Sequence, residues 1–175
     1  MRLLIVIPLA ALAASCGGEE PKAKAPERPQ AFQAGQWTSN SRVTTFRQMD
    51  EGRPRLNLPV GTEISGEACI GAAEVQRPPV ELFAGEGWND CSWGQNFRIR
   101  NGRFTAGATC MRPGLPEPVN VSVMATFTET SYEGTVEFNT QLVSDGDVRV
   151  VLQAGGERTG DCPAGGAGGN QSNAK

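Results

Sequence analysis

Two neighbouring stretches of the sequence decide the fold: VNVSVMATFT at residues 119–128 and YEGTVEFNTQL at residues 132–142. In the first stretch valine, alanine and phenylalanine alternate with polar residues or methionine, and the second stretch alternates in a similar way. Successive side chains of a β-strand point to opposite faces of a sheet, so this period of two indicates strands with one face on a core and one face in water. Such half-buried strands are typical of antiparallel sheets.

Strand patterns continue on both sides of this pair. We expect further strands at residues 36–46, 61–67, 91–99, 103–111 and 147–153, with a three-residue hairpin loop at Ser144-Asp145-Gly146. The helical candidate at residues 70–83 is interrupted by Pro78-Pro79, which predicts a short broken helix. The sequence therefore predicts a mainly β domain: a single antiparallel curved sheet or half-open barrel with one short helix.

One of the five cysteines lies near the N-terminus, apart from the other four. Cys16 follows an apolar N-terminal run, whereas the other four lie within the strand-rich part of the chain. An even set of cysteines in an exported protein predicts two disulfides. None of the four belongs to a Cys-x-x-Cys pair, so thiol redox catalysis is not expected.

The hairpin signal Asn101-Gly102 bears on which cysteines pair. A four-residue loop at residues 99–102 would set Cys91 opposite Cys110, and with them Phe97 opposite Phe104. A two-residue turn would set Cys110 opposite Trp93 and leave the two cysteines diagonal, near the limit of about 7 Å for a disulfide. We favour the four-residue loop, which predicts the pairs Cys91–Cys110 and Cys69–Cys162.

The N-terminus resembles the signal of a bacterial lipoprotein. Arg2 precedes an apolar run at residues 3–12, which is shorter than the roughly 20 residues of a membrane span. Ala13-Ala14-Ser15-Cys16 resembles a lipobox, although leucine is usual where Ala13 stands. The alternative is an ordinary signal cut after Ala13. We expect a lipoprotein signal peptide at residues 1–15 and an acylated Cys16 that carries diacylglycerol and palmitate.

Composition divides the rest of the chain. Residues 16–34 comprise the lipidated Cys16 and a proline-rich, charged stretch, which we expect to be a disordered tether. Residues 35–163 are the expected antiparallel β domain, and residues 164–175 a disordered glycine-rich tail. Gly17 follows Cys16 where aspartate would be a retention signal, so we expect the chain on the periplasmic side of the outer membrane, held by its lipid.

The landmarks of the domain resemble those of the bacterial domain of unknown function 3617 family, over residues 35–163. The resemblance rests on the opening Gly35-Gln36-Trp37, the cysteine order and the closing Gly160-Asp161-Cys162-Pro163. Members are small exported or lipid-anchored proteobacterial proteins with four cysteines. The resemblance therefore implies an architecture and a compartment, and it assigns no catalytic residue. The family motif residues are Gly35, Trp37, Gly160, Asp161, Cys162 and Pro163.

Composition also restricts the function. The chain has no histidine, which excludes Ser-His-Asp and Cys-His catalysis and metal sites that need imidazole. Its net charge of −3 and the lack of a dense basic cluster argue against a nucleic-acid partner. We expect no enzyme, no cofactor and no metal.

Several acidic and basic residues have two interpretations, one functional and one structural. Glu81, Glu86 and Asp90 lie near Trp88 and Trp93, a mixture found in glycan-acting sites, but a solvated loop beside core tryptophans is favoured. A plain turn is likewise favoured over a calcium loop at Asp145-Gly146-Asp147 and over a functional acid at Asp161. Arg98, Arg100 and Arg103 form a basic tip that could meet lipid headgroups or a polyanion, or could simply prevent strand aggregation.

Three functional classes follow. The first is an accessory or interaction scaffold in the periplasm, with an unknown envelope protein as partner, and we favour it. The second is a carrier of a small apolar ligand, in which inward small residues leave room: Ala106, Ala108, Ala125 and Gly134. The third, and least favoured, is a glycan-acting enzyme that uses carboxylates.

Overall fold

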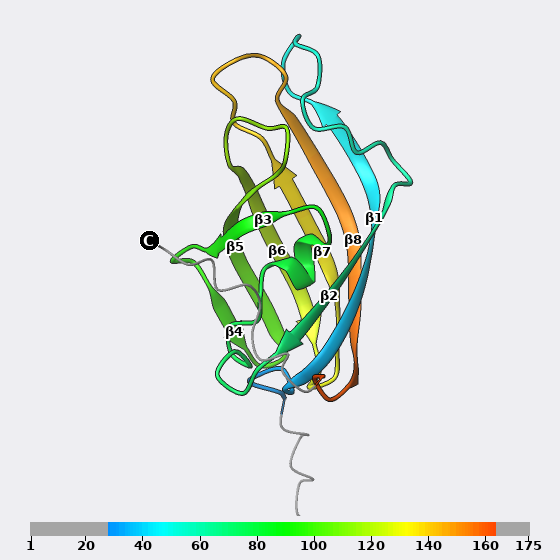
Figure 1. The fold of residues 1–175 in the computed structure, drawn as a ribbon, viewed down its shortest axis with the longest axis vertical. Helices are drawn as coiled ribbons and strands as arrows, with labels where there is room; N and C mark the ends of the chain where they lie inside the picture. The colour runs from blue at the N-terminus through cyan, green and yellow to red at the C-terminus, as the bar shows by residue number, and fades with distance from the viewer. Residues whose placement is uncertain (1–27, 164–175) are drawn as a thin grey trace, which may run out of the picture.

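The computed structural model describes residues 28–163, and one curled antiparallel sheet dominates it (Figure 1). The strand order is β2-β1-β8-β7-β6-β5-β3, and β4 also pairs with β5. This half-barrel confirms the predicted fold class. The elements are β1 (Gly35–Gln48), β2 (Glu63–Ile70), α1 (Glu81–Ala84), β3 (Asn89–Trp93), β4 (Arg98–Arg100), β5 (Arg103–Met111), β6 (Val119–Phe127), β7 (Ser131–Asn139) and β8 (Val148–Gly160).

The sheet has two unlike ends. At one end the described chain begins, and the β4–β5 and β6–β7 turns and the last residues of β2 and β8 lie together; we call it the closed end. At the other end lie three longer connections, at residues 49–62, 112–118 and 140–147; we call it the loop end. The β1 strand lies between β2 and β8, so β1 and β8, which are first and last in the sequence, are neighbours in the sheet.

The alternating strands bury one face, as their sequences predict. Along β6 the odd-numbered residues from Val119 to Phe127 are buried, while Ser122, Met124 and Thr126 are exposed. The concave side of the sheet holds the core, whose largest fully buried side chains include Trp37, Phe83, Phe104 and Phe138. The hydrophobic pattern therefore sets which face of each strand turns inward.

The predicted helix is shorter than expected. Residues 72–77 form turns, and after Pro78-Pro79 only the four residues of α1 are helical. Proline cannot supply a backbone donor to a helix interior, which explains why the helix does not extend back toward residue 70. Residues 71–88, which we call the plug, run across the concave side of the sheet (Figure 1).

The expected strand at residues 91–99 is divided into β3 and β4, and the expected four-residue loop is wrong. Arg100 pairs with Arg103 across a two-residue Asn101-Gly102 turn, whose residues have φ of 53° and 70°. Positive φ at both central residues suits the twist of a tight hairpin. Phe104 consequently faces Ile99 in the backbone register and not Phe97, although the rings of Phe97 and Phe104 still pack edge-on with centroids 5.2 Å apart.

A bulge restores the register for the disulfide. Residues 94–97 stand opposite only residues 106–107, so Trp93 faces Ala108 and Cys91 comes beside Cys110. The Cys91–Cys110 bond joins Cα atoms 4.1 Å apart, and the Cys69–Cys162 bond joins Cα atoms 5.5 Å apart. The two predicted disulfides are therefore present with the predicted partners.

Two boundaries also differ from expectation. The three-residue loop at residues 144–146 is part of a longer connection at residues 140–147, and β8 continues to Gly160. The tether was expected to extend to residue 34, but Phe32 is 3% exposed and stacks on Phe127 at 4.7 Å. The buried ring and the backbone hydrogen bonds of Phe32 to Val75 (2.9 Å) and of Gln33 to Glu129 (2.8 Å) hold this stretch on the core.

Several predictions lie outside the described residues: the signal peptide at 1–15, acylated Cys16, most of the tether and the tail at 164–175. Within residues 28–163 no helix has the length and apolar character to cross a membrane.

Candidate interaction surfaces at the two ends of the sheet

The concave side of the sheet is filled by the plug. Phe83 of α1 stacks on Phe104 of β5 with ring centroids 4.8 Å apart. The hydroxyl of Tyr132 donates to the carbonyl oxygen of Leu82 at 2.9 Å, and burial raises the pKa of this tyrosine. Side chains from the plug therefore occupy the space in which a carrier would hold a ligand.

The small inward residues pack tightly. Ala106, Ala108 and Ala125 are each less than a tenth exposed. Gly134 faces Ala125 across β6 and β7, and a Cβ added to it would lie 2.5 Å from the Cα of Ala125. The three alanines are therefore packed in the core and Gly134 lies close against β6, whereas the carrier hypothesis assigned these residues an open space.

The two tryptophans near the predicted carboxylate cluster are packing residues. Trp88 is 7% exposed and lies 4.5 Å from Phe138 between ring centroids, with the guanidinium of Arg112 over its ring. Trp93 packs edge-on against Phe104, and its Nε1 donates to the carbonyl oxygen of Pro78 at 2.7 Å. This arrangement matches the core interpretation favoured from the sequence.

The carboxylates themselves lie on separate parts of the plug and β3. Glu81 is in the single turn of α1, whereas Glu86 and Asp90 are exposed on either side of Trp88. Asp90 has a positive φ of 48° and lies in β3 at the register shift between Asn89 and Ser92. Across residues 28–163 no group of three His, Cys, Asp or Glu residues could hold a metal ion.

The opening and closing motif residues fasten the closed end. Trp37 is fully buried, and its Nε1 donates to the carbonyl oxygen of Gln33 at 3.0 Å. Nε of Arg158 donates to the carbonyl oxygen of Ala34 at 2.8 Å, and its Nη2 forms an ion pair with Asp161. Asp161 therefore holds the turn that follows β8, the structural role favoured from the sequence. The other motif residues adjoin this fastening: Gly35 faces Ile70, Gly160 faces Gln36, and Cys162 bonds to Cys69 ahead of Pro163.

The loop end is held by the carboxylate of Asp50. Its oxygens accept hydrogen bonds from the backbone N–H groups of Gly146, Asp147 and Gly52, at 2.8 to 3.0 Å. These bonds, led by that from Asp147, hold the pKa of Asp50 below its ordinary value of 3.8. Gly146 has a φ of 123°, and a Cβ there would lie 2.6 Å from the carbonyl oxygen of Arg53. The Asp50 clamp thus joins two connections that lie 96 residues apart in sequence.

The turn at Asp145-Gly146-Asp147, which was favoured over a calcium loop, is part of this clamp. Asp147 accepts a hydrogen bond from the backbone N–H of Leu142 at 2.9 Å, and it donates its own backbone N–H to Asp50. The aspartates therefore satisfy backbone donors, as the turn interpretation requires. Sequence reasoning missed Asp50, although Asp50-Glu51-Gly52 has the composition of an Asx turn.

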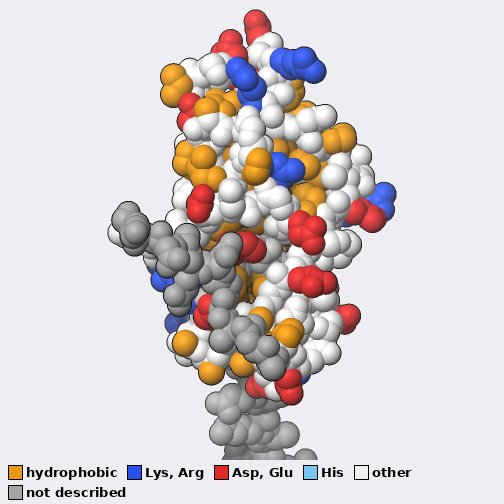
Figure 2. Space-filling model, in the orientation of Figure 1, with side chains coloured by type: hydrophobic (Ala, Val, Ile, Leu, Met, Phe, Trp, Pro, Cys, Tyr) orange, Lys and Arg blue, Asp and Glu red, His pale blue; other side chains and the backbone are white. Residues whose placement is uncertain are grey.

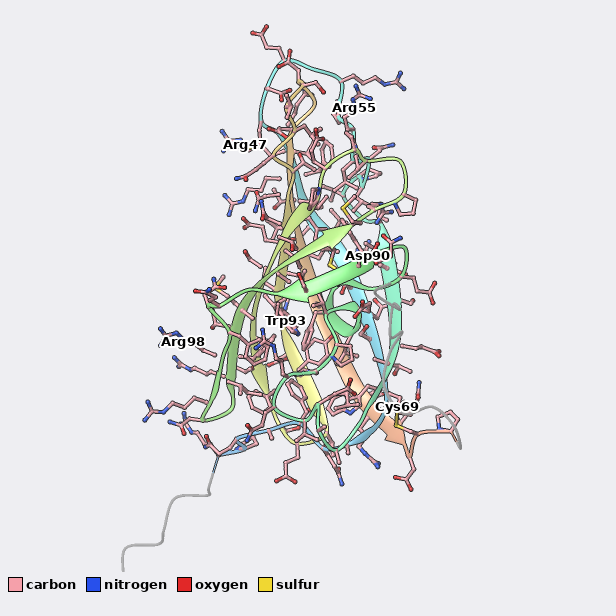
Figure 3. All side chains as sticks on the ribbon, turned by 60° about the vertical axis from the view of Figure 1, so that its left-hand side comes forward. Arg47, Arg55, Cys69, Asp90, Trp93 and Arg98 are labelled. Carbon is pink, nitrogen blue, oxygen red and sulfur yellow. A yellow bond between two sulfur atoms is a disulfide. The ribbon has the colours of Figure 1, made fainter. Side chains whose placement is uncertain are left out.

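Exposed apolar and basic side chains stand together on the clamped loops. Val143 is 94% exposed and Met49 is 52% exposed, and Arg53 and Arg55 are exposed on the same connection as Met49. Figure 2 shows apolar, acidic and basic side chains side by side at the top of the molecule, and Figure 3 shows Arg55 extending outward there. We call Met49, Arg53, Arg55 and Val143 the loop-end surface.

The predicted basic tip lies at the closed end. Arg98, Arg100 and Arg103 are exposed on the β4–β5 hairpin, and Figure 3 shows Arg98 pointing away from the sheet. These three arginines line a depression in the surface. Arg28, which sequence reasoning assigned to the tether, lines the same depression. The two ends of the sheet therefore present different surfaces: apolar and mixed at the loops, basic at the hairpin.

A family model described as "Protein of unknown function (DUF3617)" matches residues 32–162. No curated protein and no solved structure matches the chain. The matched range includes Phe32, in agreement with its burial in the core.

Proposed function

The chain belongs to the DUF3617 family, and from the two ends of its domain we propose that it is a non-enzymatic envelope lipoprotein that binds another envelope protein. In this role Cys16 carries the lipid, the closed end faces the periplasmic side of the outer membrane, and the loop-end surface meets the partner. The observation that carries the proposal is the exposed Val143 on loops fixed by the Asp50 clamp.

The position of the chain's start supports this orientation. The described chain begins at the closed end, twelve residues after Cys16, so a lipid at Cys16 would leave the loop end directed away from the membrane. A valine that is 94% exposed on a clamped loop gains nothing from burial within its own chain. Contiguous apolar patches rimmed by charges are typical of surfaces that bind proteins, and the Asp50 clamp joins the two loops that carry the exposed Met49 and Val143.

The filled interior supports a scaffold over a carrier. A ligand inside the half-barrel would need to displace Phe83 and Leu82, which are at most 1% exposed. Removing such side chains from a core costs several kcal/mol each, on the order of 2–5. We therefore propose neither the carrier nor the glycan-acting enzyme.

The anchor is tested by the mass of the protein extracted from its own envelope. We expect loss of residues 1–15, added acyl chains, and four hydrogens fewer than the fully reduced chain, since two disulfides are present. A mass that begins at Ala14 without acyl chains would refute the anchor.

The partner surface is tested by photo-crosslinking in intact cells. A photoreactive residue at Val143 is compared with one at Met124, which is 62% exposed but lies in the middle of the outer face of β6. We expect one discrete protein adduct from position 143 and none of that mass from position 124. Identical adducts from both positions, or none from either, would contradict a scaffold that binds through its loop end.

A further inference from the structure

The β4–β5 hairpin concentrates arginines on its outer face. The two-residue turn sets Arg100 directly opposite Arg103, and Arg98 lies two residues before Arg100 on the same face of the strand. All three side chains are exposed. The hairpin therefore presents three guanidinium groups in one direction.

The first described residues bring a fourth arginine to the hairpin. The backbone N–H of Gly102 donates to the carbonyl oxygen of Pro29 at 2.9 Å, and Nε2 of Gln30 donates to Oδ1 of Asn101 at 3.0 Å. These bonds hold Arg28 beside the turn. A depression of about 420 Å³ is lined by Asn101, Thr105 and four residues that we call the arginine cluster: Arg28, Arg98, Arg100 and Arg103.

The charges of this cluster are not balanced by ion pairs within residues 28–163. Like charges directly opposite one another on two strands are unfavourable, which is the position of Arg100 and Arg103. The ion pairs of the described part involve other arginines, namely Arg42, Arg149 and Arg158. The acidic residues nearest on the sheet are Glu133, two strands from Arg103, and Glu129 in the next turn, and neither forms an ion pair with the cluster.

We propose that the arginine cluster binds the phosphate groups of anionic phospholipids in the membrane that carries the protein. Guanidinium groups bind phosphate oxygens with paired hydrogen bonds, and every basic residue from 28 to 163 is arginine. The proposal rests on the proposed lipid anchor at Cys16, because twelve fully extended residues reach at most about 40 Å and keep the cluster near the headgroups. An acyl anchor and a basic patch together hold a protein more firmly than either alone.

The test is binding of the exported chain carrying Cys16→Ser to vesicles, so that no acyl chain contributes. Co-sedimentation is measured with phosphatidylglycerol–phosphatidylcholine vesicles and with phosphatidylcholine vesicles. Each arginine near an anionic surface contributes about fivefold to partitioning, so R100Q/R103Q should bind the anionic vesicles about 25-fold more weakly. R28Q/R98Q should weaken binding by a similar factor without altering the turn.

The matched control is R42Q/R47Q, which removes two positive charges from β1 away from the closed end. We expect it to bind within about twofold of the parent, because its arginines lie far from the surface that the cluster contacts. Circular dichroism of each variant confirms that the sheet is retained.

Three outcomes would overturn the proposal. They are equal binding to both vesicle types, equal weakening by R42Q/R47Q, and release by inorganic phosphate but not by chloride of the same ionic strength, which would indicate a site for a free anion. The proposed lipid anchor is tested separately, by the mass of the native chain. If that test fails, vesicle binding by the Cys16→Ser protein is unaffected.

Discussion

The two ends of this sheet are held by different kinds of interaction. At the closed end the Cys69–Cys162 disulfide links the end of β2 to the residues that follow β8, and the buried rings of Trp37 and Phe32 pack against each other in the core. At the loop end one carboxylate, that of Asp50, joins two connections through backbone N–H groups. The closed end is therefore held by a covalent bond and buried rings, whereas the Asp50 clamp at the loop end consists of hydrogen bonds at the surface. This difference is consistent with the proposed function, in which the closed end faces the membrane and the loop end binds a partner.

Removing disulfides tests the comparison most severely. Cys69–Cys162 spans 93 residues and Cys91–Cys110 spans 19. The loop-entropy model predicts that C69S/C162S lowers the free energy of unfolding by about 4.6 kcal/mol and C91S/C110S by about 3.2 kcal/mol. Urea unfolding measures both. A larger loss for C91S/C110S would show that the closed end is not the more strongly constrained part.

The expected effect of Phe32→Ala lies between those of the two disulfide variants. Its ring is 3% exposed and contacts Trp37, Phe83, Phe104 and Phe127, so its removal should cost about 4 kcal/mol in the free energy of unfolding. Urea unfolding measures this cost. Met124→Ala, at an exposed position, is the control and should cost less than about 0.5 kcal/mol. An unchanged urea midpoint for Phe32→Ala would show that Phe32 does not stabilise the core and belongs to the tether.

The Asn101-Gly102 turn gives a smaller effect at the closed end. Asn101 has a φ of 53°, and alanine tolerates this conformation poorly, so Asn101→Ala should lower the free energy of unfolding by about 1 kcal/mol. Thermal unfolding measures the change. Asn101→Gly relieves the backbone while it also removes the side-chain bond to Gln30. If glycine costs as much as alanine, the lost hydrogen bond rather than φ determines the effect.

At the loop end Asp50→Asn should act locally. We expect faster amide hydrogen exchange at Gly146 and Asp147, with a thermal midpoint close to that of the parent, because the clamp is a surface feature. The pKa of Asp50 is lowered in the folded protein, so its stabilisation is present above the ordinary value of 3.8 and is lost as the pH falls through the lower, folded value. An NMR titration of the Gly146 amide with a midpoint above 3.8 would contradict the clamp.

Val143→Ser should have the smallest effect on stability. Its side chain is 94% exposed, so the free energy of unfolding should change by less than about 0.5 kcal/mol. A photoreactive residue at Met49 in this variant should yield less of the partner adduct than in the parent. A clear loss of stability would mean that Val143 packs on its own chain and is not free for a partner.

The alternation of apolar and polar residues predicted those strands, such as β6, in which the pattern alone decides which side chains are buried. The alternation at residues 119–128 gave β6 because each residue's face depends only on its neighbours along the strand. The Cys91–Cys110 pair was right although the loop beside it was wrong, because the bulge at residues 94–97 compensates for the tight turn. A bulge of this kind leaves no periodic signal, so the register could not be read from the hydrophobic pattern.

The candidate surfaces were harder to predict because they depend on contacts between distant segments. The clamp joins Asp50 to residues 96 and 97 positions later, and no local pattern relates them. Phe32 lies in a stretch whose composition is that of a linker, and its burial depends on the space left by the plug and by Phe127. Three arginines of the cluster were recognised around their turn, whereas Arg28 was assigned to the tether.

The neighbouring positions of β1 and β8 determine the order in which the sheet can form. Gln36 pairs with Gly160, so the strand that the ribosome makes first must wait for the strand that it makes last. The strands β5 to β8 form a meander of consecutive antiparallel neighbours, so each of them pairs with the strand that is next in sequence. Until β8 exists, β1 has only β2 to pair with, and its other edge is open to strands of other chains. Folding of this domain therefore leaves that edge of β1 unpaired until β8, the last strand of the described residues, is in place.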